Sequence, residues 1–185
     1  MLLQKLTQVP KLLLPAIMLL SLCTVSVTQG SEDTANAPRE IAEDAACGKC
    51  GMFPARYQQW QTQIIFNDGT MTPFDGCKCM FSFLFNMDKF DKQHSSGDVA
   101  AAWVREFSTG DWMEAAKAHY VIGSDEMGPM GKELIPFADA AAAENFQKEH
   151  GGQTASYNAI SMETLKPLMG KMDMNGKGMK GKMKM

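Results

Sequence analysis

The sequence predicts an α+β protein made of two similar β-β-α-β units, and three observations support this prediction. Patterns typical of strand, strand, helix and strand follow one another within residues 47–110, and the same order recurs within residues 111–168. The stretches 72–75 (TPFD) and 135–139 (IPFAD) resemble each other, because each ends a strand and leads into a helix. A chain of 185 residues with 45% hydrophobic residues is long enough to bury a core in one or two small domains. We therefore expect an internal duplication.

The first unit begins with a hairpin. Residues 60–66 alternate in character as a strand does, Asn67-Asp68-Gly69 supplies turn chemistry, and residues 70–74 return as the second strand. Asp75 is expected to be the N-cap of the helix that follows. Residues 100–107 have the composition of a strand and complete the unit.

The second unit repeats this order with other residues. Strands are predicted at residues 119–123 and 133–137, with a glycine-rich loop between them. Asp139 is expected to cap a helix that ends at Gly151-Gly152, and residues 153–160 form the last predicted strand.

Residues 1–30 have the layout of a signal peptide, with lysines followed by an apolar run and then small and polar residues. The apolar run is shorter than the roughly 20 residues that a membrane-spanning helix needs. Residues 20–23 (LSLC) resemble a bacterial lipobox, in which Cys23 would be acylated and become the new N-terminus. Leu22 is bulkier than the residue usual in that motif, so soluble release after cleavage is the alternative. Both interpretations place the protein in the periplasm.

Two further segments have compositions that do not favour a packed fold. Residues 31–46 are acidic and rich in alanine and small polar residues, and we expect a disordered tether that links the leader to the folded part. Met, Lys and Gly make up nearly all of residues 169–185, which are predicted to be a disordered tail. With a net charge of −3, the chain as a whole does not suggest a nucleic-acid partner.

The chemistry lies in two cysteine pairs, each followed closely by a methionine. Cys47 and Cys50 precede Met52, and the Cys77-Lys78-Cys79 stretch precedes Met80. Thiolates and thioethers are soft ligands that prefer Cu(I), zinc or iron–sulfur clusters. This clustering indicates a site for a soft metal ion.

Four interpretations of the cysteines compete. A thiol–disulfide oxidoreductase would use Cys47 and Cys50, but Lys49 is the one nearby charge that could lower a thiol pKa. A structural Cys₄ zinc site would need all four cysteines, although Cys77 and Cys79 point to different sides of a helix. An exported protein with an even set of cysteines could also form disulfides. Cu(I) needs only two or three soft ligands, so the methionines would also take part.

Methionine and cysteine also serve as ordinary core residues, and we prefer that role for Met71, Met87 and Met113. Met130 lies between proline and glycine in the predicted loop 125–131, outside any helix or strand pattern. The candidate metal ligands are Cys47, Cys50, Met52, Cys79, Met80 and Met130.

The other reactive side chains are assigned ordinary roles. For the three histidines we prefer surface or capping roles, because none has a partner at ligand spacing. No nucleophile elbow, phosphate loop or pair of catalytic carboxylates is present, so the protein is not expected to be an enzyme.

Several motifs together resemble the NosL family, the copper chaperone lipoproteins that serve nitrous oxide reductase. The likeness covers about residues 47–160. Its motifs are Cys47-x-x-Cys50-Gly51-Met52, Pro73-Phe74-Asp75, Asp111-Trp112 with Ala115, Ala118, Tyr120 and Val121, Gly128-Pro129-Met130-Gly131, and Phe137 with Phe146 before Gly151-Gly152.

The resemblance implies an exported, usually lipid-anchored protein of two β-β-α-β units that binds one Cu(I) ion. It also implies a partner, either a copper-accepting reductase with a copper–sulfide centre or the ABC-type complex that matures it. The family pattern matches this chain at Cys50, Met52 and Met130, with Cys47 beside them. The Cys77-x-Cys79 pair and the Met-rich tail exceed that pattern, which leaves a related copper enzyme as another recipient and a second metal site as a further hypothesis.

Overall fold

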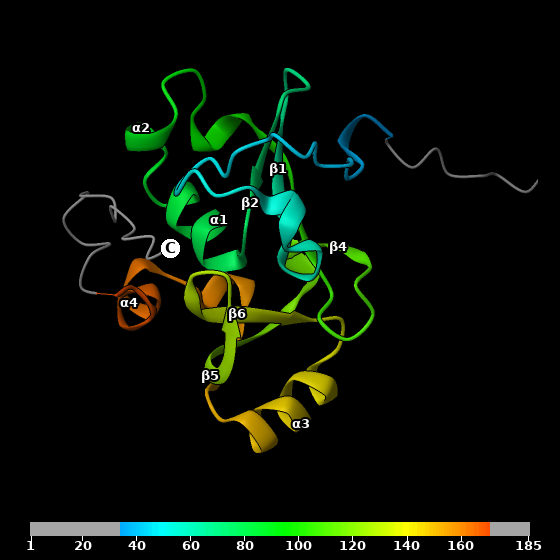
Figure 1. Ribbon diagram of the computed structural model, residues 1–185, viewed down its shortest axis with the longest axis vertical. Coiled ribbons are helices and arrows are strands. Elements are labelled where there is room, and N and C mark those ends of the chain that lie inside the picture. The colour runs from blue at the N-terminus through cyan, green and yellow to red at the C-terminus, as the bar shows by residue number, and fades with distance from the viewer. Residues whose placement is uncertain (1–33, 171–185) are drawn as a thin grey trace, which may run out of the picture. The chain divides into compact units, whose positions relative to one another are not determined.

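The computed structural model describes residues 34–170, which form two antiparallel sheets with helices packed against them (Figure 1). The first sheet has the strand order β2-β1-β3-β4 and the second has the order β6-β5-β7. This confirms the predicted α+β class. Within the described residues, no helix has both the length and the apolar composition needed to cross a membrane.

The first sheet is built around its buried strand β1. The first-sheet strands are β1 (Thr62–Phe66), β2 (Met71–Phe74), β3 (Val99–Arg105) and β4 (Trp112–Glu114). The predicted turn joins β1 to β2: Gly69 has φ +83°, and Asp68 Oδ1 accepts a hydrogen bond from the backbone N–H of Thr70. Trp60, which the alternation placed in the strand, instead ends a short 3₁₀ turn. Every residue of β1 is buried, because β2 and β3 flank it and helix and loop cover its faces.

In the second sheet the first strand, β5, also lies between two others. Its elements are β5 (His119–Gly128), β6 (Gly131–Phe137), α3 (Ala140–His150) and β7 (Gln153–Ser156). Asp139 caps α3 as predicted, since its Oδ1 accepts from Ala142 N at 2.8 Å, and Gly151 with φ +71° ends the helix. The strand β5 is longer than predicted and reaches the tip of the hairpin, where Gly128 pairs with Gly131.

Both halves therefore show the predicted order of two strands, a helix and a strand. The first half adds α2 (Met87–Phe90), and β4 pairs with β3 as an extra edge strand. The residues of β4 fall inside the predicted bounds of the second unit, 111–168, yet their backbone extends the first sheet. A last helix, α4 (Met162–Leu165), follows β7.

The described part of the expected tether, residues 34–46, is packed against the first sheet. Arg39 N donates to Gln63 Oε1 at 3.0 Å, and Gln63 Nε2 donates back to Arg39 O at 2.9 Å. Ile41 is buried, and Trp103 Nε1 donates to Asn36 O. For these residues the prediction of a disordered linker is wrong, because paired backbone groups and a buried isoleucine hold them on the sheet. The predicted leader (1–30) and the predicted tail from residue 171 onward lie outside the described residues.

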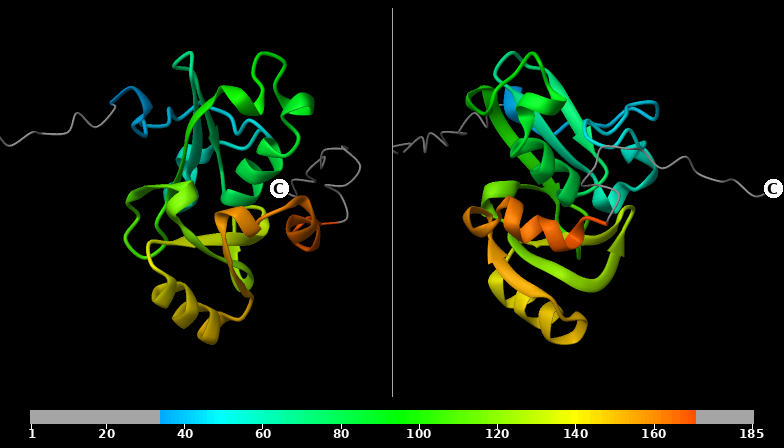
Figure 2. Two further views of the ribbon diagram at one scale, coloured as in Figure 1. Left: turned by 180° about the vertical axis from the view of Figure 1, so that it is seen from behind. Right: turned by 90° about the vertical axis from the view of Figure 1, so that its left-hand side faces the viewer.

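Helix α1 (Cys77–Leu84) lies between the first sheet and strand β6 (Figures 1 and 2). Seven of its eight residues are buried. Phe81 packs on Tyr120 of β5 with ring centroids 5.5 Å apart, and Met80 and Phe83 are in the same core. Because one core spans α1 and strands of both sheets, the position of α1 is fixed from both sides.

Candidate metal centre

The loop of residues 47–52 presents the first two cysteines from a tight turn. Cys47 N donates to Met52 O at 2.7 Å and Gly51 N donates to Cys47 O at 3.0 Å. Gly51 has φ +78°, a conformation that glycine adopts at little cost. Gly48 N donates to Pro73 O, which fastens the loop to the end of β2. The loop is thus held beside the start of α1.

The first turn of α1 adds the third cysteine. Two residues along a helix are separated by a rotation of roughly 200°, so Cys77 and Cys79 face different sides. Cys79 faces the 47–52 loop, whereas Cys77 is buried in the core and is not part of the group. All four cysteines of the described chain are free.

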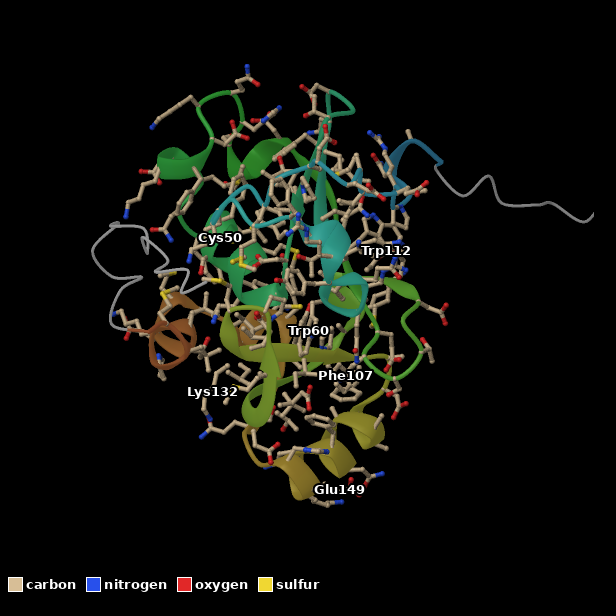
Figure 3. The ribbon with its side chains drawn as sticks, in the orientation of Figure 1. Cys50, Trp60, Phe107, Trp112, Lys132 and Glu149 are labelled. Atoms are coloured by element: carbon tan, nitrogen blue, oxygen red, sulfur yellow. The ribbon has the colours of Figure 1, made fainter. Side chains whose placement is uncertain are left out.

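The structure brings together the thiols of Cys47, Cys50 and Cys79 and the carboxylate of Asp75. One donor atom from each lies within 4.8 Å of all the others, and we call this group the thiol cluster. Cys47 Sγ is 3.1 Å and Cys50 Sγ 3.4 Å from Asp75 Oδ1. Cys47 is 4% and Cys79 1% exposed, while Cys50, labelled in Figure 3, is half-buried, so Cys50 is the thiol of the cluster that solvent reaches most easily.

Asp75 is a member that the sequence analysis missed, because it was assigned to the N-cap of the helix. The N-cap residue is Gly76, and α1 therefore has no side-chain cap at this end. The prediction that Asp75 is the N-cap is wrong, because Asp75 directs its carboxylate toward the thiols. Its Oδ2 atom is buried and has no hydrogen-bond partner among the described residues. A buried polar atom without a partner is unusual and indicates a place for a ligand.

The cluster holds a first negative charge readily and resists further ones. Hydrogen bonds from the thiols of Cys50 and Cys79 lower the pKa of Cys47 far below its ordinary value. The pKa of Cys50 and that of Cys79 are raised, chiefly because their hydrogen bonds to Cys47 favour their protonated forms. Burial, and then the Cys47 charge, raise the pKa of Asp75 to about 6. The four groups therefore favour one negative charge over two in the absence of a metal ion.

A second carboxylate supports the helix without entering the cluster. Glu133 of β6 is 1% exposed, and its Oε1 accepts hydrogen bonds from Lys78 N and Leu134 N. It lies at the N-terminal end of α1, where a negative charge is favourable. Burial raises the pKa of Glu133 to about 7.

The three methionines that were predicted as metal ligands differ in burial and in their place in the fold. Met80 is completely buried in the hydrophobic core beside Cys79. The backbone of Met52 closes the 47–52 loop. Met130 lies at the tip of the β5–β6 hairpin. Its carbonyl accepts a hydrogen bond at 2.7 Å from Nζ of Lys78, the residue that precedes Cys79. The hairpin tip is thus brought to the first turn of α1, and ligation by the three thioethers stays a prediction.

The histidines lie outside the thiol cluster. His94 contacts Asp91 and Asp68 near the β1–β2 turn, and His150 contacts Asp125 at the end of α3. His150 is thus at a helix end, whereas the His94 side chain is only 11% exposed and stacks on Phe66 instead of lying free on the surface.

The fold and the thiol cluster define a class: a small α+β protein with a half-buried site for a soft metal ion. The NosL family model matches residues 38–165, more than half of the chain. The chain therefore belongs to the NosL family.

Two solved structures resemble the chain. The crystal structure of the copper chaperone NosL from Shewanella denitrificans is 20% identical with a TM-score of 0.60, and the match covers 69% of this chain and 98% of that one. The solution structure of the apo-NosL protein from Achromobacter cycloclastes is 22% identical with a TM-score of 0.43, covering 56% and 87%. The comparison with curated proteins found no match.

Proposed function

We propose that this protein binds Cu(I) at the thiol cluster and transfers it to a copper enzyme. The observation that carries the proposal is the convergence of three thiols and one carboxylate within 4.8 Å, open on one side. Membership of the NosL family and the copper chaperone from Shewanella denitrificans support copper as the cargo. The protein acts as a carrier and not as an enzyme.

The recipient that we propose is nitrous oxide reductase with its copper–sulfide centre, or a related copper enzyme, reached directly or through an ABC-type maturation complex. Export follows from the predicted leader, and acylation of Cys23 would anchor the chain to a membrane. Replacing Cys23 by alanine should then abolish labelling with a radioactive fatty acid and move the protein from the membrane fraction to the soluble periplasmic fraction. Labelling that persists in the variant would exclude the lipid anchor.

The donor set favours the lower oxidation state of copper. Thiolates are soft ligands, and Cu(I) is satisfied by two or three of them. Cys47 already holds a negative charge, while Cys50 and Cys79 release protons only when a cation replaces them. Transfer proceeds by ligand exchange, in which an acceptor thiol or thioether approaches the ion on the side of the half-buried Cys50 and replaces that ligand first. Met52 and Met130 are the thioethers that we propose as further ligands.

The electrostatics of the Cys-x-x-Cys motif argue against the oxidoreductase alternative. An attacking cysteine needs a lowered pKa and access to the substrate. Here the cysteine with the lowered pKa, Cys47, is only 4% exposed, and the accessible Cys50 has a raised pKa. The largest causes of the lowered Cys47 pKa are hydrogen bonds with the neighbouring thiols of Cys50 and Cys79. Zinc is the stronger alternative, since three thiolates and a carboxylate also suit a tetrahedral ion.

The test is an anaerobic titration of the reduced protein with Cu(I) and, separately, with Zn(II), each in competition with a chelator of known affinity. We expect a strong preference for Cu(I). Replacement of Cys79 by alanine should lower the Cu(I) affinity by more than about 100-fold, the upper end of what loss of an outer-shell partner costs. The matched control is Cys77→Ala, on the same helix turn but outside the thiol cluster, which should bind Cu(I) as the native protein does. Equal affinity for the two metals would support the zinc site and overturn the proposal.

A further inference from the structure

Lys78, between the two cysteines of α1, is a buried lysine with an unusual set of partners. It is 1% exposed, and its ammonium group donates to three backbone carbonyls: Met130 O at 2.7 Å, Lys132 O at 2.9 Å and Leu168 O at 3.3 Å. An ammonium group has three N–H donors, so these three carbonyls use all of them. A buried charge without such partners is strongly unfavourable.

Lys78 contacts β6 both with its backbone and with the end of its side chain. Its backbone N–H donates to the buried Glu133, while its ammonium binds the carbonyl of the preceding residue, Lys132. The positive charge also lowers the pKa of Glu133 against the larger effect of burial. Lys78 therefore joins α1 to the second sheet twice, through its backbone N–H and through its ammonium group.

The segments that Lys78 holds both carry methionine. Met130 is the tip of the β5–β6 hairpin, and Leu168 directly precedes Met169. Apolar packing does little to fix the hairpin tip, because Met130 is half-buried and Met127 on the same hairpin is 54% exposed. The hydrogen bond from Lys78 to Met130 O links the tip to the residue next to Cys79.

We propose that Lys78 is a positioning residue of the copper site, which holds the Met130 hairpin where its thioether reaches the ion bound by Cys79. The inference rests on the proposed function. Lys78 does not touch the metal. It fixes the backbone of one ligand relative to the helix that carries another, as outer-shell groups do in metal proteins.

The experiment is a double-mutant cycle with Lys78→Met, which keeps the length of the side chain but has no charge and no donor. The change is made together with Glu133→Gln, so that no unpaired charge stays buried, and each combination is tested with Met130 or with Met130→Leu. Cu(I) affinity is measured by competition, and the number of Cu–S contacts by X-ray absorption. The matched control is Lys132→Met, because Lys132 Nζ donates to the carbonyls of Gly123 and Ser124 in the same hairpin but lies away from Cys50 (Figure 3).

With Met130 present, we expect the Lys78→Met/Glu133→Gln protein to bind Cu(I) about 10- to 100-fold more weakly and to lose one Cu–S contact. In the Met130→Leu background the same change should alter the affinity less than about twofold, since the ligand that Lys78 positions is already gone. Lys132→Met should leave both measurements unchanged.

The outcomes separate the inference from the proposed function. An equal loss of affinity in both backgrounds would show a purely structural role of Lys78 and overturn the inference. So would native affinity and an unchanged Cu–S number in the Lys78→Met/Glu133→Gln protein. Failure of the native protein itself to bind Cu(I) would overturn the proposed function.

Discussion

Asp75 is a carboxyl group whose position at the cluster has opposite effects on the stability of the fold and on metal binding. Without a metal ion, its ionised form is buried near the charged Cys47, and this raises its pKa to about 6. With a metal ion present, the same negative charge lies beside a cation. Groups held at a binding site in an unfavourable state commonly reduce stability in this way.

Replacing Asp75 by asparagine should therefore weaken copper binding and stabilise the metal-free protein. We expect the Cu(I) affinity to fall by about 10- to 100-fold at pH 8. The difference from the native protein should shrink below pH 6, where the native carboxyl group is protonated. The folded-state pKa lies above the ordinary value of 3.8, so the native protein loses stability as pH rises from 3.8 to about 6.

Chemical unfolding of the metal-free proteins checks the second half of this prediction. At pH 7 the Asp75→Asn protein should be more stable by roughly 2 kcal/mol, and the two proteins should approach each other at pH 4. A less stable variant at pH 7 would contradict the assigned cost of burying this charge.

Single residues also show where sequence reasoning stops. The cysteines were found because thiols in pairs are rare and chemically specific. Asp75 was missed because an aspartate at the start of a helix is also the usual N-cap, and the sequence does not say which way the carboxylate turns. Lys78 and Glu133 gave no signal either, since a lysine or a glutamate is normally exposed and only the assembled core shows that they are buried.

Helix α1 is placed by its contacts with strands on both sides. At its N-cap, Gly76 lies against the carboxylate of Glu133, and a Cβ atom at this position would overlap that group. The close approach explains why glycine is present although its backbone is extended, with φ 171°.

Gly76→Ala should destabilise the fold by about 1–3 kcal/mol, because the new methyl group pushes β6 away from the start of α1. Urea unfolding measures the effect. Gly97→Ala serves as the control, since its Cβ would meet only Ser95 Oγ at 3.7 Å, an ordinary contact, and its effect should stay within about 0.5 kcal/mol. Equal effects of the two changes would rule out the close approach as the cause.

The β1–β2 turn and the segment before β3 are joined by His94. Its ring stacks on Phe66 with centroids 3.9 Å apart, and its nitrogens contact Asp91 Oδ2 at 2.7 Å and Asp68 Oδ2 at 3.2 Å. Hydrogen bonds to Asp91 and then Asp68 raise the pKa of His94 above its ordinary 6.5. The charged imidazole therefore stabilises this connection.

The pH dependence of stability should reflect this histidine. A raised folded-state pKa gives stabilisation that is fully present below pH 6.5 and is lost as the pH rises through the folded-state value. His94→Gln should remove this contribution, so the stability gap between the native protein and the variant should be larger at pH 6 than at pH 9. A gap that does not change with pH would show that only the stacking on Phe66 matters.

At the level of elements, local signals were predicted well and pairing was not. The turn at residues 67–69 and the cap at Asp139 depend on a few neighbouring side chains, and both are confirmed. The extension of β5 to Gly128 could not be foreseen, because it runs through the polar residues 124–126. Their strand conformation depends on the pairing of β5 with β6 on both sides of them. Trp60 fitted the alternation of β1 but ends in a 3₁₀ turn that packs against Phe107.

In the molecule as a whole, the thiol cluster joins two segments that are far apart in sequence: the 47–52 loop, and residues 75–79, where the end of β2 leads into the first turn of α1. The sequence could indicate candidate metal ligands but not that their side chains lie close together, because this depends on how the loop, the hairpin and the helix pack. The repeated β-β-α-β order was predictable from patterns, whereas the packing of residues 34–46 against β1 was not.

Cu(I) should stabilise the whole fold, because the ion would bridge these two distant segments only in the folded state. At a free metal concentration about 1,000 times the dissociation constant, the gain is about 4 kcal/mol, or roughly 8–16 °C in Tm. Calorimetry with and without Cu(I) under anaerobic conditions measures it, and a competing chelator should reverse it. Cys79→Ala should lose most of the gain, whereas Cys77→Ala should keep it.

The same measurements also test the disulfide interpretation. The four described cysteines are free, so a reductant alone should not change the Tm of the metal-free protein. A fall in Tm on reduction would show that disulfides contribute to stability.

If the protein carries copper as proposed, the unequal exposure of the three cysteines would impose an order on the steps of copper release. Cys47 and Cys79 are shielded on every side, so an acceptor can compete first only for the bond to Cys50. In the proposed carrier, the ion would stay attached to the two shielded sulfurs while the acceptor forms its own bond, so it would not be released as a free ion. The depth at which each sulfur lies would thus set the direction of the proposed transfer.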